Sequence, residues 1–415
     1  MSSFPKNFLW GASTSSHQVE GNNHNDWSEW EKKNAGRLAK ESESKFGQLA
    51  AWSHIKEEAQ RPESYISGIA CDHYNRFKED FDIAKHLGHN AHRFSIEWSR
   101  SEPEEGKFDD KEIEHYREVI KALRDRGLEP FVTLWHWTMP LWMAEKGGII
   151  SKEFPVYFER YVRYTVEKLK DGVTFWMTLN EPTAVIGAAY KSGQWPPQKR
   201  SAVLALRAFR VLADAHSRAY KTIHEINHNA EVGCGHGLWY VEPRNARSLL
   251  DRWAARFYRF FANHYFFRLT GRGVHDYIGV QQYRYFYVRF PQVLQSPKAP
   301  VSDMGWELMP EGTFKILMEM KRYGKPMYLT EHGLADADDS RRAWFIAETL
   351  KNIKKTMEAG AYVRGYFHWS LMDNFEWDKG FWPRFGLVAV DRKTLGRKIR
   401  PSALEYKKII QEISH

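Results

Sequence analysis

The sequence is poor in cysteine, with two residues, Cys71 and Cys234, in a chain of 415. Two thiols build neither a disulfide framework nor a cysteine-rich zinc site, and such scarcity is typical of the reducing cytoplasm. No apolar run approaches the roughly 18 residues that a membrane span needs. The first residues lack a basic region followed by an apolar stretch, so we expect no signal peptide. These absences predict a cytoplasmic protein without a membrane partner.

Linkers and repeats are missing as well. The chain has no low-complexity segment, no long Pro-, Gly- or Ser-rich stretch, and no repeat of 20 to 50 residues. A boundary between two domains would be expected to leave such a trace. The sequence therefore predicts a single domain that spans residues 1–415.

The excess of basic charge is modest. The chain has 61 Lys and Arg against 52 Asp and Glu, which gives a formal net charge of +9. In some proteins such an excess of basic charge serves to bind nucleic acid or acidic membranes. Here acids and bases are interspersed, and no nucleic-acid module is recognisable. We interpret the charge as a solvated surface and expect no nucleic-acid partner.

Aromatic residues are abundant, with 17 Trp, 20 Tyr and 25 Phe. Their rings fill hydrophobic cores, and they also stack on the apolar C–H faces of sugars. Composition does not separate these two roles, so the positions of the rings have to decide between them.

Short β-prone runs alternate eight times with longer amphipathic stretches, which predicts an α/β protein with a single (β/α)₈ barrel. The expected strands are Phe8–Ser13, Ala91–Trp98, Pro130–Trp137, Val173–Leu179, Glu231–Gly235, Asp276–Tyr283, Pro326–Thr330 and Val363–Trp369. The expected helices are Phe77–Leu87, Asp109–Arg126, Pro155–Leu169, Ser201–Ile226, Leu249–Leu269, Glu311–Tyr323 and Ser340–Ala359. Two segments are expected as long loops, Ser28–Ala70 and Phe375–Arg400.

Two carboxylates end apolar strands of this barrel, Glu181 after strand 4 and Glu331 after strand 7. Active sites of such barrels lie at the carboxyl ends of the strands, so both side chains should face one mouth. A lone glutamate there is more often a neighbour of a helix cap or a salt-bridge partner. A facing pair is the minimum apparatus for cleaving a glycosidic bond, because one group must be protonated and the other ionised.

Four segments resemble, in order, the motifs of glycoside hydrolase family 1, the β-glucosidase family. They are FLWGASTSSHQVEG at 8–21, TLNEP at 178–182, LTEHG at 329–333 and YFHWSLMDNFEW at 366–377. The resemblance runs from Phe4 to about Pro401. It implies a retaining β-glycosidase that removes terminal non-reducing β-D-glucosyl residues, with β-galactosides and β-fucosides as further substrates.

The resemblance also implies roles for the residues that carry the chemistry. Glu331 matches the nucleophile, which forms a covalent glycosyl-enzyme, and Glu181 matches the general acid and base. Arg93 matches an arginine beside the nucleophile, and Tyr283 matches a tyrosine that donates a hydrogen bond to it. Asn180 matches the residue that contacts the sugar 2-hydroxyl.

The remaining matches concern substrate binding. The resemblance places Glu376 on the 4- and 6-hydroxyls, where its charge would repel a 6-phosphate, and Trp369 as the floor on which the sugar stacks. It places Trp377 near the 3- or 4-hydroxyl of the sugar. Trp137 matches a position that varies among subfamilies. The implied substrate-binding residues are Gln18, His136, Trp137, Asn180, Trp369, Glu376 and Trp377.

The chain departs from the family pattern at three positions near the site. His332 stands where the family has Asn, and Gln281 and Gln282 stand where it commonly has Asn-Tyr. These changes affect the hydrogen bonds expected around the nucleophile. The chain is also short for the family, so we expect trimmed loops at the mouth and an open aglycone side.

We expect neither a metal nor another cofactor. Histidines 17, 332 and 368 fall near the predicted mouth, but no HxH ends strand 1 and no HExxH lies on a helix. The expected partners are small β-glycosides and oligosaccharides such as cellobiose. The sequence leaves open whether the protein forms a homo-oligomer. Two alternatives remain: a transglycosylase with the same intermediate, and a non-catalytic sugar-binding barrel.

Overall fold

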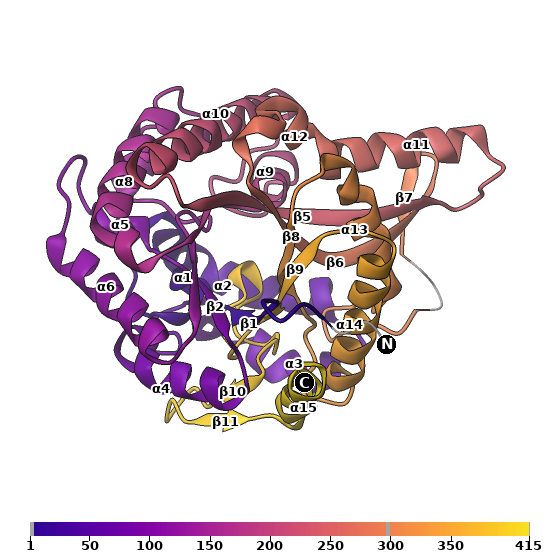
Figure 1. The fold of residues 1–415 in the computed structure, drawn as a ribbon. Helices are drawn as coiled ribbons and strands as arrows, with labels where there is room; N and C mark the ends of the chain where they lie inside the picture. Colours follow the sequence, from indigo (N-terminus) through magenta and orange to yellow (C-terminus); the bar gives the residue numbers. More distant parts are fainter. Residues whose placement is uncertain (1–3, 296–298, 415) are drawn as a thin grey trace.

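The structure, a computed structural model, describes residues 4–295 and 299–414 and contains a closed barrel of eight parallel strands (Figure 1). The strands are β1 (Leu9–Ser13), β2 (Ala91–Ser95), β3 (Glu129–Thr133), β4 (Phe175–Asn180), β5 (Glu231–Pro243), β6 (Tyr277–Arg289), β8 (Met327–His332) and β9 (Val363–Trp369). They follow the order β5-β4-β3-β2-β1-β9-β8-β6, and β5 pairs with β6 to close the ring. The predicted (β/α)₈ barrel is confirmed, and each predicted run overlaps one of its strands.

Helices cover the outside of the barrel (Figure 1). The main ones are α4 (His73–His86), α6 (Asp110–Asp125), α8 (Phe154–Leu169), α10 (Ala202–Ile226), α13 (Glu311–Met320) and α14 (Arg342–Glu358). The helix expected over 249–269 is broken into α11 (Leu249–Arg259), a π-helical turn (Phe260–His264) and α12 (Tyr265–Thr270). A last helix, α15 (Pro401–Ser414), was not predicted.

Large side chains fill the interior of the barrel. Phe131 of β3 lies among Phe175, Tyr277, Tyr328 and Phe367, with ring centroids 5.1, 5.2, 5.6 and 5.3 Å away. Aromatic pairs at these separations pack favourably edge to face or offset. The interior is therefore a packed core, as in other barrels of this size, and the polar groups of the site lie at the strand ends.

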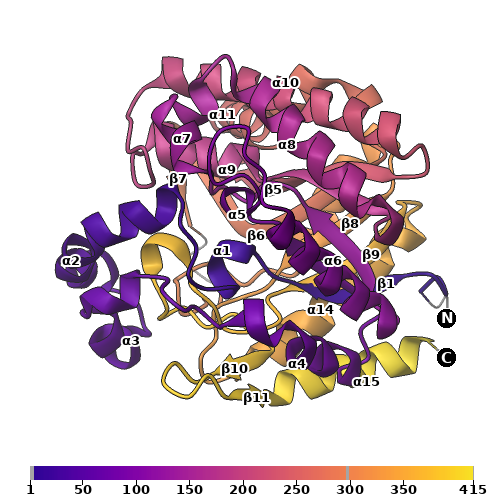
Figure 2. The same ribbon diagram turned by 90° about the vertical axis from the view of Figure 1, so that its left-hand side faces the viewer.

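The two segments expected as loops contain regular structure. Residues 28–70 include most of α2 (Asp26–Phe46) and all of α3 (Trp52–Ala59), which lie side by side at one end of the barrel (Figure 2). Asn25 caps α2, because its side chain accepts a hydrogen bond from the Ser28 amide at 2.9 Å. In turn, the Ser28 hydroxyl accepts one from the Asn25 amide at 3.0 Å. The second segment contains the hairpin of β10 (Val388–Val390) and β11 (Arg397–Ile399). Both segments are long connections that follow barrel strands, β1 and β9, as predicted, but they are not without regular structure.

Strands β5 and β6 are longer than predicted. They stay paired beyond the barrel rim, from Trp239 opposite Arg284 to Pro243 opposite Val288. With β7 (Gln292–Leu294) and α11 they project from the barrel (Figure 1). We call residues 239–264 and 284–294 the arm.

Candidate active site

A cavity of about 450 Å³ opens at the carboxyl ends of the strands. Three of the predicted residues lie outside its lining and are fully buried: Gln18, Arg93 and Asn180. Each of these three hydrogen-bonds to a residue or backbone carbonyl of the site, as described below. The other eight line the cavity: His136, Trp137, Glu181, Tyr283, Glu331, Trp369, Glu376 and Trp377.

Glu331, near the end of β8, is surrounded by hydrogen-bond donors. Its Oε2 accepts a hydrogen bond from the Tyr283 hydroxyl at 2.9 Å. Its Oε1 accepts one from Gln281 Nε2 at 3.0 Å and forms an ion pair with Arg93. Burial raises the pKa of Glu331, and the Arg93 guanidinium and the Tyr283 hydroxyl oppose that rise. These donors stabilise the ionised form.

Glu181 directly follows β4 and caps the short helix α9 (Pro182–Ile186). Its φ of +41° turns the side chain into the mouth, and its amide donates to the Gly235 carbonyl at 2.9 Å. The carboxyl packs against backbone, since a Cβ atom at Gly237 would lie 2.8 Å from Oε1. That Oε1 atom is buried without a hydrogen-bond partner among the described residues.

The two carboxyls therefore differ in environment. Burial, and then the nearby charge of Glu331, raise the pKa of Glu181 well above its ordinary value. Arg93 lowers it again, but no described group donates a hydrogen bond to Glu181 Oε1. Of two interacting carboxyls, the one with more hydrogen-bond donors and the closer cation ionises more readily. The surroundings of the pair therefore favour the charge on Glu331 and the proton on Glu181.

Arg93 also fixes the neighbouring polar groups. Its Nη2 donates to Asn180 Oδ1 at 2.6 Å, and Gln281 Nε2 donates to the same oxygen at 2.7 Å. With its oxygen occupied, Asn180 presents its amide nitrogen to His136 Nε2 at 3.0 Å. Burial holds the pKa of His136 well below its usual range, so the ring is neutral. Its proton is then on Nδ1, which has no partner among the described residues and is free to donate to a ligand.

Gln18 and Glu376 meet on the other side of the cavity. Gln18 Nε2 donates to the Phe375 carbonyl at 2.7 Å and lies 3.4 Å from Glu376 Oε2. Gln18 Oε1 has no partner in the described part of the chain. Burial raises the pKa of Glu376 to about 8, although the Lys379 ammonium lowers it. Glu376 thus presents a carboxyl to the cavity, and Gln18 lies next to it outside the lining.

Tryptophans form the walls of the cavity. Trp377 lies with its ring centroid 4.7 Å from that of Trp137 and 6.0 Å from that of His136. The Trp137 indole donates to the Asn180 carbonyl at 2.9 Å, which ties this wall to the polar network. Trp369, the last residue of β9, is 6.0 Å from His136. Flat apolar walls beside a few fixed donors and acceptors suit a sugar ring.

Gln281, which the sequence marked only as a departure from the family pattern, is a residue of the site. Its Nε2 bridges Glu331 and Asn180, whereas Gln282 accepts a hydrogen bond from Thr313 of α13. Its position at the end of a predicted strand was the available signal. The outer part of the cavity has a lining that the sequence did not predict: Trp195, Leu238, Trp239, Arg284, Met304 and Trp306.

His332 does not touch the site. Its ring stacks on Phe345 of α14 at 4.8 Å, and its Nε2 lies 3.3 Å from the Thr313 hydroxyl. Successive side chains of a strand alternate between its faces, so Glu331 points inward and His332 points to the helices. This departure from the family pattern leaves the hydrogen bonds of Glu331 untouched.

Among residues 4–295 and 299–414, no three His, Cys, Asp or Glu side chains are grouped so that they could hold a metal ion. In the same part of the chain, no helix is long and apolar enough to cross a membrane.

Comparison with known proteins identifies the family. The chain matches the family model "Glycosyl hydrolase family 1" over residues 1–292 and 281–414. It is 32% identical to β-glucosidase A of Thermotoga maritima, over 98% of both chains.

Solved structures agree with this match. A β-glycosidase from Pyrococcus horikoshii is 36% identical and superposes with a TM-score of 0.87, over 99% of this chain and 95% of that one. The β-glucosidase from Thermotoga maritima in complex with glucoimidazole is 30% identical and superposes with a TM-score of 0.85, over 99% of each chain. The chain therefore belongs to glycosyl hydrolase family 1, and it is a retaining β-glycosidase.

Proposed function

We propose that Glu331 is the nucleophile and Glu181 the general acid and base of this β-glycosidase. The observation that carries the proposal is the contrast between the two carboxyls of one cavity. Glu331 accepts hydrogen bonds from Arg93, Gln281 and Tyr283, whereas Glu181 Oε1 has no donor among the described residues. A retaining mechanism needs one ionised and one protonated carboxyl at the same bond.

In the first step a carboxylate oxygen of Glu331 attacks the anomeric carbon. The bond from that carbon to the aglycone oxygen breaks, and Glu181 gives its proton to the departing oxygen. The products are a glycosyl ester of Glu331 and a free alcohol. Because esterification removes the charge of Glu331, one of the causes that raise the pKa of Glu181 disappears.

In the second step Glu181, now a carboxylate, takes a proton from a water molecule. The water oxygen attacks the anomeric carbon and the ester bond to Glu331 breaks. The carboxylate of Glu331 and the proton of Glu181 are then restored. Two inversions at one carbon return the β configuration.

The substrates that fit this cavity are small β-D-glucosides, including cellobiose, with β-galactosides and β-fucosides as further candidates. Trp369 serves as the stacking floor, and His136, which lines the cavity, has an Nδ1 atom without a partner among the described residues. Gln18 lies outside the lining, where its Oε1 is unpartnered among the described residues and its amide nitrogen lies beside Glu376. Glu376 accepts from two hydroxyls when it is ionised. The Thermotoga maritima relative binds glucoimidazole, which supports a glucose-shaped site.

The whole chain forms one domain under this proposal, since the strands of the barrel extend from β1 to β9 and α15 covers its base. Cys71 and Cys234 are buried and unpaired, which supports a reducing compartment such as the cytoplasm.

The test compares Glu181→Ala with Glu331→Gln. Glu181→Ala should still form the intermediate from p-nitrophenyl β-D-glucoside, whose leaving group needs little protonation, but should turn over about 10² to 10⁴ times more slowly. Added azide should restore turnover and give β-glucosyl azide, identified by its NMR coupling constant.

Glu331→Gln serves as the control for the nucleophile. It should be inactive towards p-nitrophenyl β-D-glucoside, and azide should not restore activity with retained configuration. An α-azide from Glu181→Ala, or near-full activity of Glu331→Gln, would contradict the assignment.

A further inference from the structure

The arm exposes an unusual amount of apolar surface. Fifteen large hydrophobic side chains are exposed among the described residues, and eight of them lie on the arm. Scattered exposed apolar residues are ordinary, but a contiguous group marks an interaction surface. The eight are Trp239, Leu249, Leu250, Trp253, Phe257, Phe260, Phe290 and Val293.

Helix α11 turns its small residues inward and its large ones outward. Ala254 and Ala255 are buried against Val241, Phe286 and Val288 of the extended strands. On the outer side Trp253 is 59% and Phe257 is 45% exposed, with ring centroids 5.5 Å apart. A surface helix of a globular protein normally has the opposite arrangement. The helix is therefore anchored by alanines and presents its aromatic face to the surroundings.

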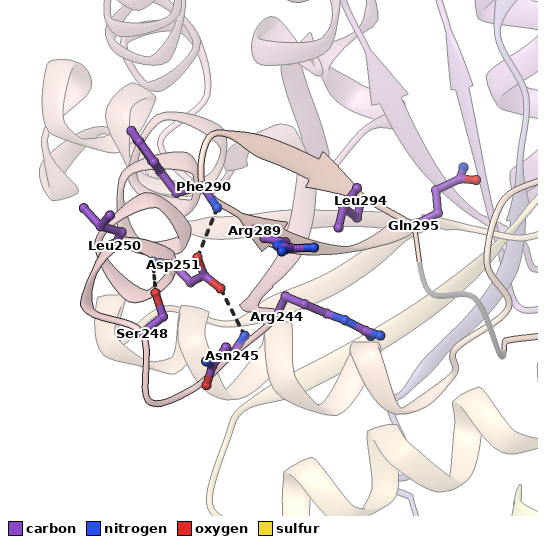
Figure 3. Close-up of a pocket in the computed structure, with 9 residues that line it drawn as sticks. All are labelled: Arg244, Asn245, Ser248, Leu250, Asp251, Arg289, Phe290, Leu294 and Gln295. Carbon is purple, nitrogen blue, oxygen red and sulfur yellow. Dashed lines mark hydrogen bonds between the residues drawn. The ribbon is translucent and has the colours of Figure 1, made fainter.

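The arm also carries more than half of the net charge of the protein. Its residues, 239–264 and 284–294, include seven Arg and two acidic residues, Glu242 and Asp251, a net of +5 in a chain whose total is +9. Asp251 is buried and accepts hydrogen bonds from the backbone amides of Asn245, at 3.2 Å, and Phe290, at 3.1 Å (Figure 3). Glu242 accepts hydrogen bonds from the hydroxyls of Tyr240 and Tyr285, so both carboxylates of the arm have partners within it.

The arginines of the arm are mostly without acidic partners. In the part of the chain that the structure describes, no ion pair is formed by Arg244, Arg247, Arg252, Arg256 or Arg289. Arg244 and Arg289 line a groove of about 700 Å³ beside Leu250 and Phe290 (Figure 3). The arm thus combines exposed aromatic rings with unpaired guanidinium groups.

We infer that the arm docks on the surface of an anionic lipid bilayer. Helices that lie in a membrane interface combine Trp, Phe and Leu on one side with Arg or Lys beside them, and anionic headgroups attract the cations. The long arginine side chains reach headgroups while the rings enter the apolar boundary. A second copy of this chain fits less well, because a symmetric dimer would bring two clusters of +5 together.

Peripheral docking does not need the apolar span that the sequence lacks. The expectation of no membrane partner rested on the absence of such a run. The arm instead gathers side chains that are dispersed in sequence, from Trp239 on β5 to Val293 on β7.

The docking face continues into the mouth of the cavity. Trp239 lines the cavity and lies 5.2 Å from Phe286, which packs on α11. Docking would hold the outer, aglycone side of the cavity close to the lipid surface, where glycosides with apolar aglycones collect. This consequence rests on the proposed function, whereas docking itself does not.

The test measures co-sedimentation with vesicles of 30% phosphatidylglycerol in phosphatidylcholine, against pure phosphatidylcholine. The full chain should bind the anionic vesicles and should be released by raised salt. The double variants Trp253→Ser with Phe257→Ser, and Arg252→Glu with Arg256→Glu, should each bind about 30-fold or more weakly.

Two control variants carry matched changes elsewhere. Lys111→Glu with Lys121→Glu reverses two exposed charges on α6, and Trp344→Ser removes an exposed ring from α14. Both should bind like the unchanged chain. All variants should keep their melting temperature and their turnover of soluble p-nitrophenyl β-D-glucoside, which separates docking from catalysis.

Three outcomes would overturn the inference. The unchanged chain does not sediment with anionic vesicles, or the arm variants bind as well as the controls. The third is a dimer, seen by light scattering, that Trp253→Ser with Phe257→Ser dissociates while vesicle binding is absent.

Discussion

Replacing Arg93 by Met tests how the site divides its charge between two carboxyls. Arg93 is fully buried and forms an ion pair with Glu331, and its Nε donates to the Thr133 hydroxyl at 3.0 Å. Met keeps much of the volume and removes the charge. The guanidinium lowers the pKa of both Glu331 and Glu181, so its loss should raise both values.

The magnitude follows from the contact. A cation in direct contact lowers the pKa of a carboxyl by about 1 to 3 units, and one unit corresponds to about 1.4 kcal/mol. The acid limb of the profile of kcat/KM against pH reports the ionisation of Glu331 in the free enzyme. In Arg93→Met this limb should therefore move to higher pH by about 1 to 3 units. The alkaline limb, set by Glu181, should move in the same direction.

The assay follows release of p-nitrophenol, quenched in alkali, from pH 4 to 10. Tyr283→Phe provides a graded control, because it removes one neutral donor from Glu331 and should move only the acid limb, by about 1 unit. Thermal unfolding of each variant checks that the barrel is intact. Limbs that stay in place in a folded Arg93→Met enzyme would refute the assignment of the charge to Glu331.

Three further predictions concern the polar network, the stability and the metal. Gln281→Met should lower kcat/KM about 10- to 100-fold, since Glu331 and Asn180 each lose a donor; steady-state kinetics with unchanged values would contradict this role. Burial raises the pKa of Asp26 to about 7, so the folded state holds a proton that the unfolded state releases near pH 4. The free energy of unfolding should therefore fall as pH rises from about 4 to 7. The melting temperature of Asp26→Asn should fall less over that range. EDTA should leave turnover unchanged, and restoration of a lost activity by a divalent metal would refute a metal-free mechanism.

Much of the site was predictable because its residues stand next to strand ends. An apolar run followed by Glu places the carboxyl at the mouth whatever the details of packing, and this holds for Glu181 and Glu331. The side on which Gln281 and Gln282 lie was not predictable in this way. The pairing of β6 with β8 shifts register between Val280 and Gln281, and the shift selects which amide faces Glu331.

The ends of β5 and β6 were also beyond local sequence. Both predicted strands stop near the rim, but each continues because the other supplies its hydrogen bonds as far as Pro243 and Val288. The helix expected over 249–269 has a strong apolar pattern, which usually predicts a face packed on the barrel. Only the tertiary structure shows that α11 packs through Ala254 and Ala255 and leaves Trp253 outside.

The sequence by itself determined the eight strands, the main helices between them and the two carboxyls at strand ends, because these depend on local patterns and on residues beside strand ends. The tertiary structure decided the raised pKa of Glu181, the tautomer of His136 and the exposed face of the arm. Those properties arise from burial and from neighbours that are distant in the chain. They depend on how the strands pair and how the barrel closes.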